Sequence, residues 1–482
     1  NAHLPDGVDD AFAAQRQIAT EDFVRLIFTY KALKRQFNKR RTFYKADKDI
    51  LKGYFSALPF ALTVSQKKAL DDIIGDMTGG AYMNRLLMGD VGSGKTAVAF
   101  AAAYFAIGSG SQCAFIAPTE LLARQHYKAA SELLGGLGIK VVILTAACAA
   151  SEKKYVTEAI KSGEAQLIIG THSLFSENVI YGNLRLVIID EQHRFGVKEK
   201  DAIIKKASEA DVLTLSATPI PRALSLALLS ELDVSVIERR SRIDDMISTK
   251  IVPDYKRNDM FAYIRERAVS GRQAYIVAPR IEDAEGVETD TVKALYKELK
   301  EGLFNDIDIA VLHGKSLKAD KQAVMDGFNG GSISVLICTT VIEVGIDVKN
   351  ASVMAVMNAE NYGLAALHQL RGRVGRGTEK SYCFLHTTKD DNARLTVLAE
   401  CGDGFAVSER DFDMRGGGNF LGEKQSGSFE NLNNYAVKID KELISEAKLI
   451  AEGIELNKET LGIFREMNYQ KYYNIIKNTV FN

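Results

Sequence analysis

The sequence predicts two α/β units in tandem, each built around a parallel β-sheet. Two observations support this fold class. Two successive series of short apolar runs alternate with helical segments, and a glycine-rich loop of the phosphate-binding type follows one of the first runs. The length of 482 residues agrees, because at roughly 150 residues per domain it suggests about three globular units.

The composition is that of an ordinary folded chain, with 46% hydrophobic and 26% charged residues. The 61 basic and 62 acidic residues give a net charge of −1, which excludes a globally basic nucleic-acid coat but not a local basic face. The longest nearly uninterrupted apolar stretch, Ala97–Ile107, is shorter than the roughly 18–20 residues of a membrane span. We therefore expect no membrane partner, and we find no secretory signal.

The five cysteines lie far apart and never form a CxxC pair. This spacing predicts neither a disulfide framework nor a zinc site, and it favours a reducing, intracellular setting. The first residue is Asn1 rather than Met, so we interpret the sequence as a piece of a longer protein.

Residues 10–41 are predicted to form one long helix, because apolar residues from Ile18 to Phe37 recur at helical spacing. The end of this helix, Lys31–Arg41, carries six basic residues and no acidic one. A solvated helix face is the favoured interpretation of this run. A patch that faces phosphates is the alternative.

The first unit is predicted from short aliphatic runs, each followed by a turn or helix signal, as is typical of buried parallel strands. These runs are Arg85–Met88, Ala114–Ala117, Val141–Leu144, Leu167–Ile169, Leu186–Ile189 and Val212–Leu215. The second unit is predicted from a second series of the same kind. Its runs are Ala274–Val277, Ile309–Leu312, Val335–Cys338, Val353–Val356 and Tyr382–Leu385. The seam is expected near residues 239–248, and beyond about residue 390 helical and glycine-rich segments replace the alternation.

The strongest motif is the loop Gly89–Thr96, which matches GxxxxGKT between a predicted strand and an alanine-rich helix. Its glycines let backbone N–H groups close around phosphates, and the helix N-terminus adds its positive dipole end. Lys95 would reach the β- and γ-phosphates and Thr96 would hold Mg²⁺, so the motif predicts ATP and Mg²⁺ as cofactors. The predicted nucleotide-binding residues of the loop are Gly89, Gly92, Ser93, Gly94, Lys95 and Thr96.

A phosphate-binding loop needs a carboxylate at the end of a neighbouring strand, and Asp190 and Glu191 follow the run Leu186–Ile189. Asp190 is predicted to bind Mg²⁺ through water, and Glu191 to orient and deprotonate the attacking water. Two adjacent acids alone are more often the polar start of a loop. The phosphate-binding loop upstream favours a hydrolytic pair.

A switch that reports nucleotide state is suggested by Ser216 and Thr218, whose hydroxyls follow a predicted strand near the expected γ-phosphate edge. A helix N-cap with Pro219 in the first turn explains the same residues about equally well. The sequence does not decide between these interpretations.

Three arginines, Arg371, Arg373 and Arg376, are interleaved with glycine, which makes poor helix and poor core material. A hydrolase that works between two domains needs cations brought to the γ-phosphate from the opposite side. Arg373 and Arg376 are predicted to supply them, whereas Arg371 could equally pair with an acid. A solvated basic loop is the alternative. Upstream, Gly345 and Asp347 follow a strand of the second series and are predicted to line the same cleft.

Eight motifs in order resemble those of superfamily 2 helicases. They are GDVGSGKT (89–96), APTELLARQH (117–126), GTHSLF (170–175), DEQHRFGV (190–197), SATPIPR (216–222), LHGK (312–315), TTVIEVGIDV (339–348) and QLRGRVGRG (369–377). Two of them, DEQHRFGV and SATPIPR, resemble the RecG family of bacterial ATP-dependent DNA helicases, which remodel stalled replication forks. The resemblance runs from about residue 3 to 430 and implies two RecA-like domains that close on ATP and walk along DNA.

The resemblance also implies roles that the residues alone do not give. It assigns Gln66 to adenine recognition. It assigns Thr119, Arg124 and Thr171 to the side of the first domain that faces the DNA backbone.

Residues 403–427 resemble the translocation motif shared by the RecG family and the transcription-coupled repair translocase. In that motif a helical hairpin and loop convert ATP-driven closure into a stroke on duplex DNA. Arg415 and Gln425 match its polar positions, whereas Gly416–Gly418 stands where a Pro-containing turn is usual. Without the resemblance, residues 413–428 would be interpreted as a flexible glycine-rich loop.

The resemblance implies four parts of the chain. They are a linker helix left from the N-terminal wedge region (1–56), the helicase ATP-binding domain (57–243), the helicase C-terminal domain (244–398), and the translocation hairpin with C-terminal helices (399–482). The wedge domain itself, an OB-fold that splits the fork arms, is expected to be missing from this sequence.

The predicted function is an ATP-dependent double-stranded DNA translocase, or helicase, that drives branch migration and fork reversal in replication restart, recombination and repair. A transcription-coupled repair translocase, a DNA-independent P-loop phosphotransferase and a passive nucleic-acid-binding fragment are the alternatives. Expected partners are double-stranded and branched DNA (forks and Holliday junctions), with single-stranded DNA-binding protein as a further candidate. We expect a monomer in the bacterial cytoplasm, associated with the nucleoid.

Overall fold

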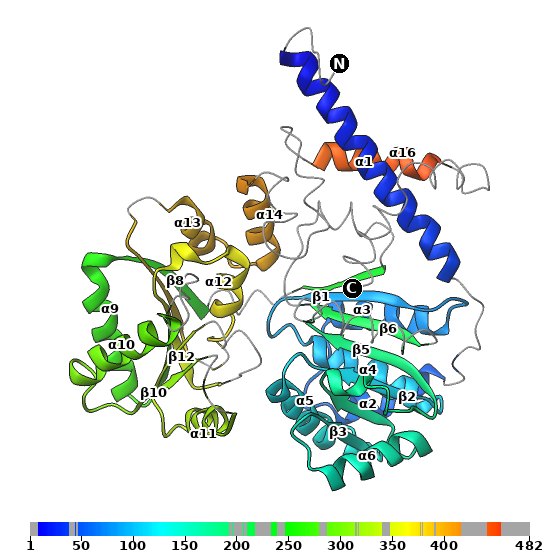
Figure 1. The fold of residues 1–482 in the computed structure, drawn as a ribbon, viewed down its shortest axis with the longest axis horizontal. Helices are drawn as coiled ribbons and strands as arrows, with labels where there is room; N and C mark the ends of the chain where they lie inside the picture. The colour runs from blue at the N-terminus through cyan, green and yellow to red at the C-terminus, as the bar shows by residue number, and fades with distance from the viewer. Residues whose placement is uncertain are drawn as a thin grey trace. The chain divides into compact units, whose positions relative to one another are not determined.

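The computed structural model contains two compact units, each with its own parallel sheet (Figure 1). The first unit includes Gly94–Glu238 and the second includes Arg239–Asp411. The prediction of two α/β units in tandem is therefore confirmed. The structure describes residues 8–37, 44, 47–191, 195, 206, 210–216, 233–238, 246–278, 287–313, 316, 318–339, 348–375, 377, 379–389, 392–415 and 441–454.

Seven strands form the sheet of the first unit in the order β3-β4-β2-β5-β6-β1-β7, and every neighbouring pair runs parallel. The strands are β1 (Asn84–Gly89), β2 (Gln112–Ile116), β3 (Val141–Leu144), β4 (Leu167–Gly170), β5 (Leu184–Asp190), β6 (Asp211–Ser216) and β7 (Asp233–Ile237). The helices of this unit include α2 (Leu51–Ala57), α3 (Val64–Thr78), α4 (Lys95–Gly108), α5 (Glu120–Leu133) and α6 (Ala150–Ser162). Parallel strands need crossover connections, which α4, α5 and α6 supply.

Helix α4 belongs to the core of the first unit because it is apolar on almost all sides. Its Phe100 packs edge-on against Phe115 of β2, with ring centroids 5.7 Å apart. Tyr54 of α2 is fully buried and donates a hydrogen bond to the Ala97 carbonyl at 2.7 Å, and burial raises the pKa of its hydroxyl. Among the described residues, no helix is both long and apolar enough to cross a membrane.

Six strands form the sheet of the second unit in the order β10-β11-β9-β12-β13-β8, again all parallel. The strands are β8 (Ile247–Pro253), β9 (Gln273–Val277), β10 (Ile309–Leu312), β11 (Val335–Cys338), β12 (Ala351–Val356) and β13 (Ser381–Thr387). The helices of this unit include α9 (Arg257–Val269), α10 (Val287–Glu301), α11 (Lys318–Asn329), α12 (Leu364–Arg371) and α13 (Ala393–Glu400). Tyr263 of α9 packs edge-on against Tyr382 and Phe384 of β13, and burial there raises the pKa of Tyr263 to about 12.

The aliphatic runs predict every strand of both sheets except β7 and β8. β7 lies at a sheet edge beside β1, and β8 lies at a sheet edge beside β13. An edge strand has one bonded neighbour and is partly exposed, so apolar and polar residues are mixed along Asp233–Ile237 and Ile247–Pro253. The other two edge strands, β3 and β10, are predicted because their runs are short but purely aliphatic.

Helix α1 (Val8–Phe37) confirms the predicted N-terminal helix, and residues 38–41 of the predicted span lie outside the described residues. It packs against α16 (Lys441–Gly453), a helix from the other end of the sequence (Figure 1). Phe28 of α1 and Leu443 of α16 are fully buried. The side chains of the basic end, Lys31–Arg41, lie outside the described residues, so their solvated-face interpretation stays a prediction.

Two glycines of the first unit give a matched test of its packing. At Gly170, the last residue of β4, a Cβ would collide with the Leu144 carbonyl oxygen of β3 and lie 3.0 Å from the Leu174 side chain. At Gly75, inside α3, a Cβ would meet no atom within 4 Å. We predict that Gly170→Ala lowers the free energy of unfolding by about 1–3 kcal/mol through overpacking. Gly75→Ala should raise it by up to about 1 kcal/mol through helix propensity. Calorimetric melting measures both effects, and equal midpoints for the two variants would contradict this packing.

Candidate active site

The predicted catalytic residues of the first unit meet at the carboxyl edge of three adjacent strands, β5, β6 and β1. The register pairs Leu215 of β6 with Asp190 of β5 on one side and with Leu87 of β1 on the other. The phosphate-binding loop begins at Gly89, where β1 ends, and Ser216 ends β6. Ligands of parallel α/β sheets bind outside this edge, so the register brings the loop and the carboxylate to one place.

The loop after β1 turns tightly because two of its glycines adopt left-handed backbone angles. Gly92 has a φ of 81° and Gly94 has a φ of 86°, a region that side chains of L-residues rarely adopt. The Ser93 N–H donates to the Asp90 carbonyl at 3.1 Å, and α4 begins directly after Gly94. The first N–H groups of a helix have no partner within the helix, so the loop presents donors and the positive dipole end to an anion.

Lys95, the first residue of α4, folds back over this loop. Its Nζ donates a hydrogen bond to the Gly89 carbonyl oxygen at 2.6 Å. The ammonium is thus held within the turn that the glycines form, where phosphate oxygens would replace the carbonyl as its partner. Thr96 follows in the first turn of α4, and its hydroxyl oxygen is a hard ligand of the kind that Mg²⁺ prefers. The cation, the N–H groups and the hydroxyl fit a Mg²⁺-bound nucleotide.

Gln66 lies in the first turn of α3 with its amide nitrogen against the loop, so that a Cβ at Gly94 would collide with it. The amide oxygen of the same side chain accepts from the Thr63 N–H at 2.8 Å, and the Gln66 N–H donates to the Thr63 hydroxyl at 3.2 Å. This capping box fixes the side chain. The structure therefore brings Gln66 to the nucleotide loop, and its role in adenine recognition stays a prediction.

Asp190 ends β5 as a buried carboxylate and contacts a residue for which the sequence predicts no role. Its Oδ2 lies 2.9 Å from Nε2 of His126 on α5. The His126 ring packs on Phe115 of β2, with ring centroids 4.6 Å apart. The signal in the sequence is weak: His126 shares helical spacing with Leu122 and Ala123 on the buried face of α5, which predicts burial but no partner.

Glu191 follows in a conformation that residues other than glycine rarely adopt, with a φ of 50°. Its N–H donates to the Leu215 carbonyl of β6 at 3.0 Å, which holds the residue at the end of the strand. Strained backbone of this kind clusters at active sites and persists only where the surrounding structure over-determines it. The strained conformation favours a catalytic role for Glu191.

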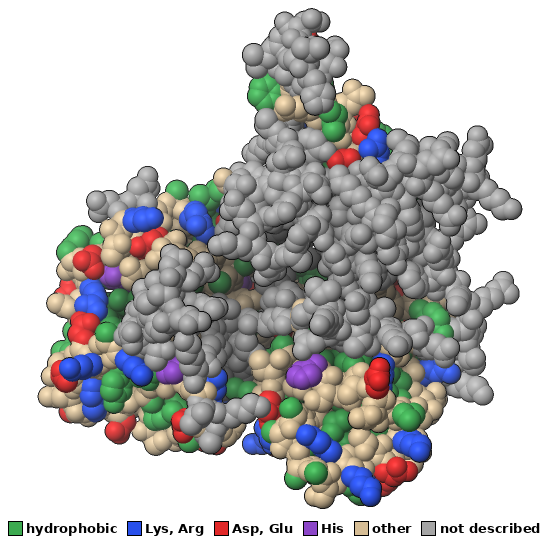
Figure 2. All heavy atoms as spheres, viewed as in Figure 1, with side chains coloured by type: hydrophobic (Ala, Val, Ile, Leu, Met, Phe, Trp, Pro, Cys, Tyr) green, Lys and Arg blue, Asp and Glu red, His purple; other side chains and the backbone are tan. Residues whose placement is uncertain are grey.

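The residues that the resemblance assigns to the DNA backbone follow other strands at the same sheet edge. Thr119 is the N-cap of α5, and its hydroxyl accepts from the Leu122 N–H at 3.3 Å. Arg124 is exposed on the same helix and pairs with Glu120 at 3.0 Å, a contact worth little in water. Thr171 is buried directly after β4. Where Figure 2 draws described side chains, basic and acidic ones are mixed on this face.

In the second unit, Arg371 ends α12 and is almost fully buried. Its guanidinium donates to the Leu398 carbonyl at 3.0 Å, to the Cys401 carbonyl at 2.6 Å and to the Gly402 carbonyl. These carbonyls lie at the C-terminal end of α13, where the helix dipole favours a cation. Arg371 therefore ties the arginine run to α13.

Arg373 is also buried, and its backbone N–H donates to the Leu370 carbonyl at 3.0 Å. Gly375 then turns the chain with a φ of 80°, and a Cβ there would lie 2.5 Å from the Ile247 side chain of β8. The run is thus a packed turn at this point rather than a solvated basic loop. Arg376, the second predicted cation, lies outside the described residues.

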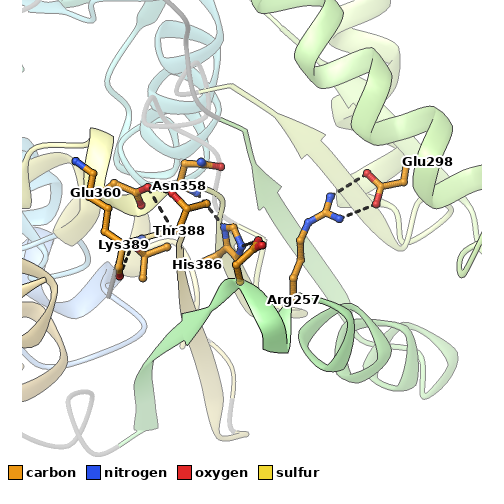
Figure 3. Close-up of polar contacts among 9 residues, drawn as sticks. Arg257, Glu298, Asn358, Glu360, His386, Thr388 and Lys389 are labelled. Carbon is orange, nitrogen blue, oxygen red and sulfur yellow. Dashed lines mark hydrogen bonds and ion pairs between the residues drawn. The ribbon is translucent and has the colours of Figure 1, made fainter. Parts of the chain in front are cut away.

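Figure 3 shows polar contacts that hold the segment between β12 and α12. The Asn358 N–H donates to Nδ1 of His386 at 3.3 Å, so Nε2 carries the ring proton and faces Asp254 at 3.1 Å. The Thr388 hydroxyl donates to the Glu360 carboxylate at 2.9 Å. These contacts fasten the loop that leads into α12, and with it the arginine run, to the carboxyl ends of β13 and β8.

Several predicted site residues lie outside the part of the chain that the structure describes: Thr218, Gly345, Asp347, Arg376 and Gln425. Arg415 ends α14 (Gly404–Arg415), and its side chain is outside the described atoms. Gly416–Gly418 of the expected hairpin loop is outside them as well. The roles of these residues stay predictions.

Comparisons with known proteins identify the family of this chain. The family model for the DEAD/DEAH box helicase matches residues 63–226, and that for the helicase conserved C-terminal domain matches residues 256–378. ATP-dependent DNA helicase RecG of Synechocystis is 38% identical over 88% of this chain and 52% of its own length. RecG of Staphylococcus aureus is 36% identical over 99% of this chain and 70% of its own length. The chain belongs to the RecG family.

A solved structure of RecG bound to a three-way DNA junction superposes on this chain with a TM-score of 0.77. The two sequences are 34% identical, and the match covers 93% of this chain and 58% of the solved RecG chain. With the two helicase families matched in order, the predicted pair of RecA-like units is confirmed. The chain spans 52% and 60% of the lengths of its RecG relatives from Synechocystis and Thermotoga maritima.

The left-handed Gly94 allows a direct test of the nucleotide loop. We predict that Gly94→Ala weakens the binding of a fluorescent ATP analogue at least about tenfold, since left-handed backbone costs an L-residue roughly 1–2 kcal/mol. The collision with Gln66 adds to this cost. Gly110→Ala is the control, because Gly110 also has a φ of 80° but precedes the amino end of β2, and a Cβ there would meet no atom within 4 Å. Fluorescence titration measures both, and wild-type affinity in Gly94→Ala would contradict the assignment of the loop.

Proposed function

We propose that this chain hydrolyses ATP to translocate along double-stranded DNA and to remodel branched DNA such as forks and Holliday junctions. The proposal rests on one observation: the Gly89–Thr96 loop, Lys95 and the buried Asp190 converge at one sheet edge in a chain of the RecG family. RecG relatives are described as ATP-dependent DNA helicases, and one of them was solved on a three-way DNA junction.

In this proposal the loop binds the triphosphate of ATP. Backbone N–H groups and the N-terminus of α4 hold the phosphate oxygens, and Lys95 exchanges its bond to the Gly89 carbonyl for the β- and γ-phosphates. Thr96 and Asp190 would hold Mg²⁺, which supplies positive charge to the same phosphates when bound. Gln66, beside Gly94, is proposed to recognise adenine.

Glu191 is the proposed general base. It takes a proton from the attacking water while the water oxygen bonds to the γ-phosphorus and the bond to ADP breaks, which releases ADP and phosphate. Arg373 and Arg376 are proposed to supply positive charge to the transferred phosphoryl group. The further residues proposed to line this site or to sense the γ-phosphate are Ser216, Thr218, Gly345 and Asp347.

The proposed DNA contacts are to the sugar–phosphate backbone, which carries position but no sequence information. Thr119, Arg124 and Thr171 supply them in the first unit, and Arg415 and Gln425 are proposed to turn ATP-driven closure into a stroke on duplex DNA. We further propose that the protein acts as a monomer in the bacterial cytoplasm, near the nucleoid, with single-stranded DNA-binding protein as a partner.

Steady-state ATP hydrolysis without DNA, with linear duplex and with a model fork tests the proposal. The salt concentration is fixed, because contacts to phosphates depend on salt. We predict strong stimulation by duplex that is lost in Lys95→Ala and in Arg376→Ala. A rate indifferent to every DNA would contradict the translocase and favour a DNA-independent phosphotransferase. If fork and linear duplex stimulate hydrolysis equally, fork recognition would belong to the part of the RecG relatives that this chain does not match.

The role of Glu191 is tested by replacing its carboxylate with the amide of glutamine. We predict that Glu191→Gln slows ATP hydrolysis by about 10²–10⁴-fold, the usual contribution of a general base, while a fluorescent ATP analogue still binds with wild-type affinity. The amide has the shape of the carboxylate but takes up no proton. Hydrolysis by Glu191→Gln at more than half of the wild-type rate would rule Glu191 out as the base.

A further inference from the structure

The contact between His126 and Asp190 joins the proposed metal site to another element of the fold. Both residues are buried, with 8% and 9% of their surfaces exposed, and His126 Nε2 lies 2.9 Å from Asp190 Oδ2. An ionised carboxylate can only accept hydrogen bonds, so the imidazole must donate through Nε2–H. Of the two oxygens of Asp190, one is thus fixed by a protein donor.

The His126 ring itself has little freedom to move. One face packs on Phe115 of β2, with ring centroids 4.6 Å apart and planes tilted by 47°. Phe115 in turn packs on Phe100 of α4, the helix that begins at Lys95 of the nucleotide loop. The imidazole therefore lies where α5, β2 and the end of β5 meet, and a displacement of α5 changes the donor that faces Asp190.

Helix α5 is also the element that begins at the proposed DNA side. Thr119 caps its first turn, and His126 follows about two helical turns later, roughly 10 Å along the axis. Between and beyond them, Leu122, Ala123 and Ala130 bury the same face of the helix. Close-packed interiors have low compressibility and transmit strain, so a displacement of the first turn of α5 would reach His126.

We propose that His126 is a positioning residue, whose Nε2–H holds the Asp190 carboxylate in the orientation that binds Mg²⁺–nucleotide. The same hydrogen bond joins Asp190 to α5, the helix whose first turn carries the proposed DNA contact Thr119. The inference rests on the proposed function for its DNA part. Groups that orient the ligands of a metal ion commonly change metal affinity or activity by about 10–100-fold when they are removed. His126 holds such a position toward Asp190, the carboxylate that would help to hold Mg²⁺.

A purely structural role would make a different prediction. A buried pair that only stabilises the fold would change the melting temperature when broken, and nucleotide binding would keep its dependence on Mg²⁺. A positioning role changes the Mg²⁺ dependence and is restored by any side chain that donates from the same place. The two roles are therefore separable by measurement.

Three variants of His126 form the test. His126→Phe keeps a ring against Phe115 but removes the donor, and His126→Gln keeps an N–H donor at nearly the reach of Nε2. If the phenylalanine variant does not fold, His126→Asn replaces it, because its shorter amide does not reach Asp190. Glu132→Ala, an exposed position near the end of the same helix, is the neutral control.

The first readout is the Mg²⁺ concentration at which binding of a fluorescent ATP analogue is half-maximally strengthened. We expect His126→Phe to raise this concentration by about 10–100-fold, and His126→Gln and Glu132→Ala to stay near the wild-type value. Wild-type Mg²⁺ dependence in His126→Phe, in a chain that melts normally, would overturn the positioning role. An equal loss in His126→Gln and His126→Phe would also overturn it, because rescue by a donor would have failed.

The second readout is the factor by which linear duplex DNA stimulates ATP hydrolysis. We expect this factor to fall in His126→Phe more than the DNA-free rate falls, and to recover in His126→Gln. An unchanged factor would overturn the link to α5. If the wild-type chain itself ignores duplex DNA, the proposed function fails, whereas the Mg²⁺ readout still decides whether His126 positions Asp190.

Discussion

The parallel pairing of β5, β6 and β1 is the constraint on which the candidate site depends. Asp190 lies opposite Leu215, and Ser216 lies opposite Met88, one residue before the nucleotide loop begins. A shift of one residue in this register would turn every side chain of a strand to the other face. Because the buried residues of both faces forbid such a shift, the loop and the carboxylate reach the sheet edge at one level before any ligand binds.

The central strands, and the meeting of the nucleotide loop with Asp190 at one sheet edge, could be predicted from the sequence, since both follow from local patterns. A buried strand is an aliphatic run, and such runs lead directly into the nucleotide loop at Gly89 and into Asp190. The edge strand β7 could not be predicted, because Asp233 and Ser235 interrupt its apolar residues, and the partner of Ser235, the Arg85 guanidinium, is distant in the sequence. The role of His126 could not be predicted either, because its partner lies 64 residues away in the chain.

Buried polar contacts set the position of functional loops in both units. In the first unit, His126 fixes Asp190 and the capping box of α3 fixes Gln66. In the second, Arg371 joins the arginine run to α13, and His386 fastens the segment before α12. Such contacts are costly to break once buried. The proposed motor requires this stiffness, because a stroke is transmitted only through elements that move as rigid bodies.

The most direct test of the central claim is displacement of a fluorescent third strand from triplex DNA by the purified chain. The account predicts that ATP hydrolysis drives the chain along the duplex and ejects the third strand. It further predicts that Glu191→Gln binds ATP and duplex without ejecting it. Duplex-stimulated hydrolysis by the wild-type chain with no displacement at any ATP concentration would contradict translocation, and with it the motor proposed for these residues.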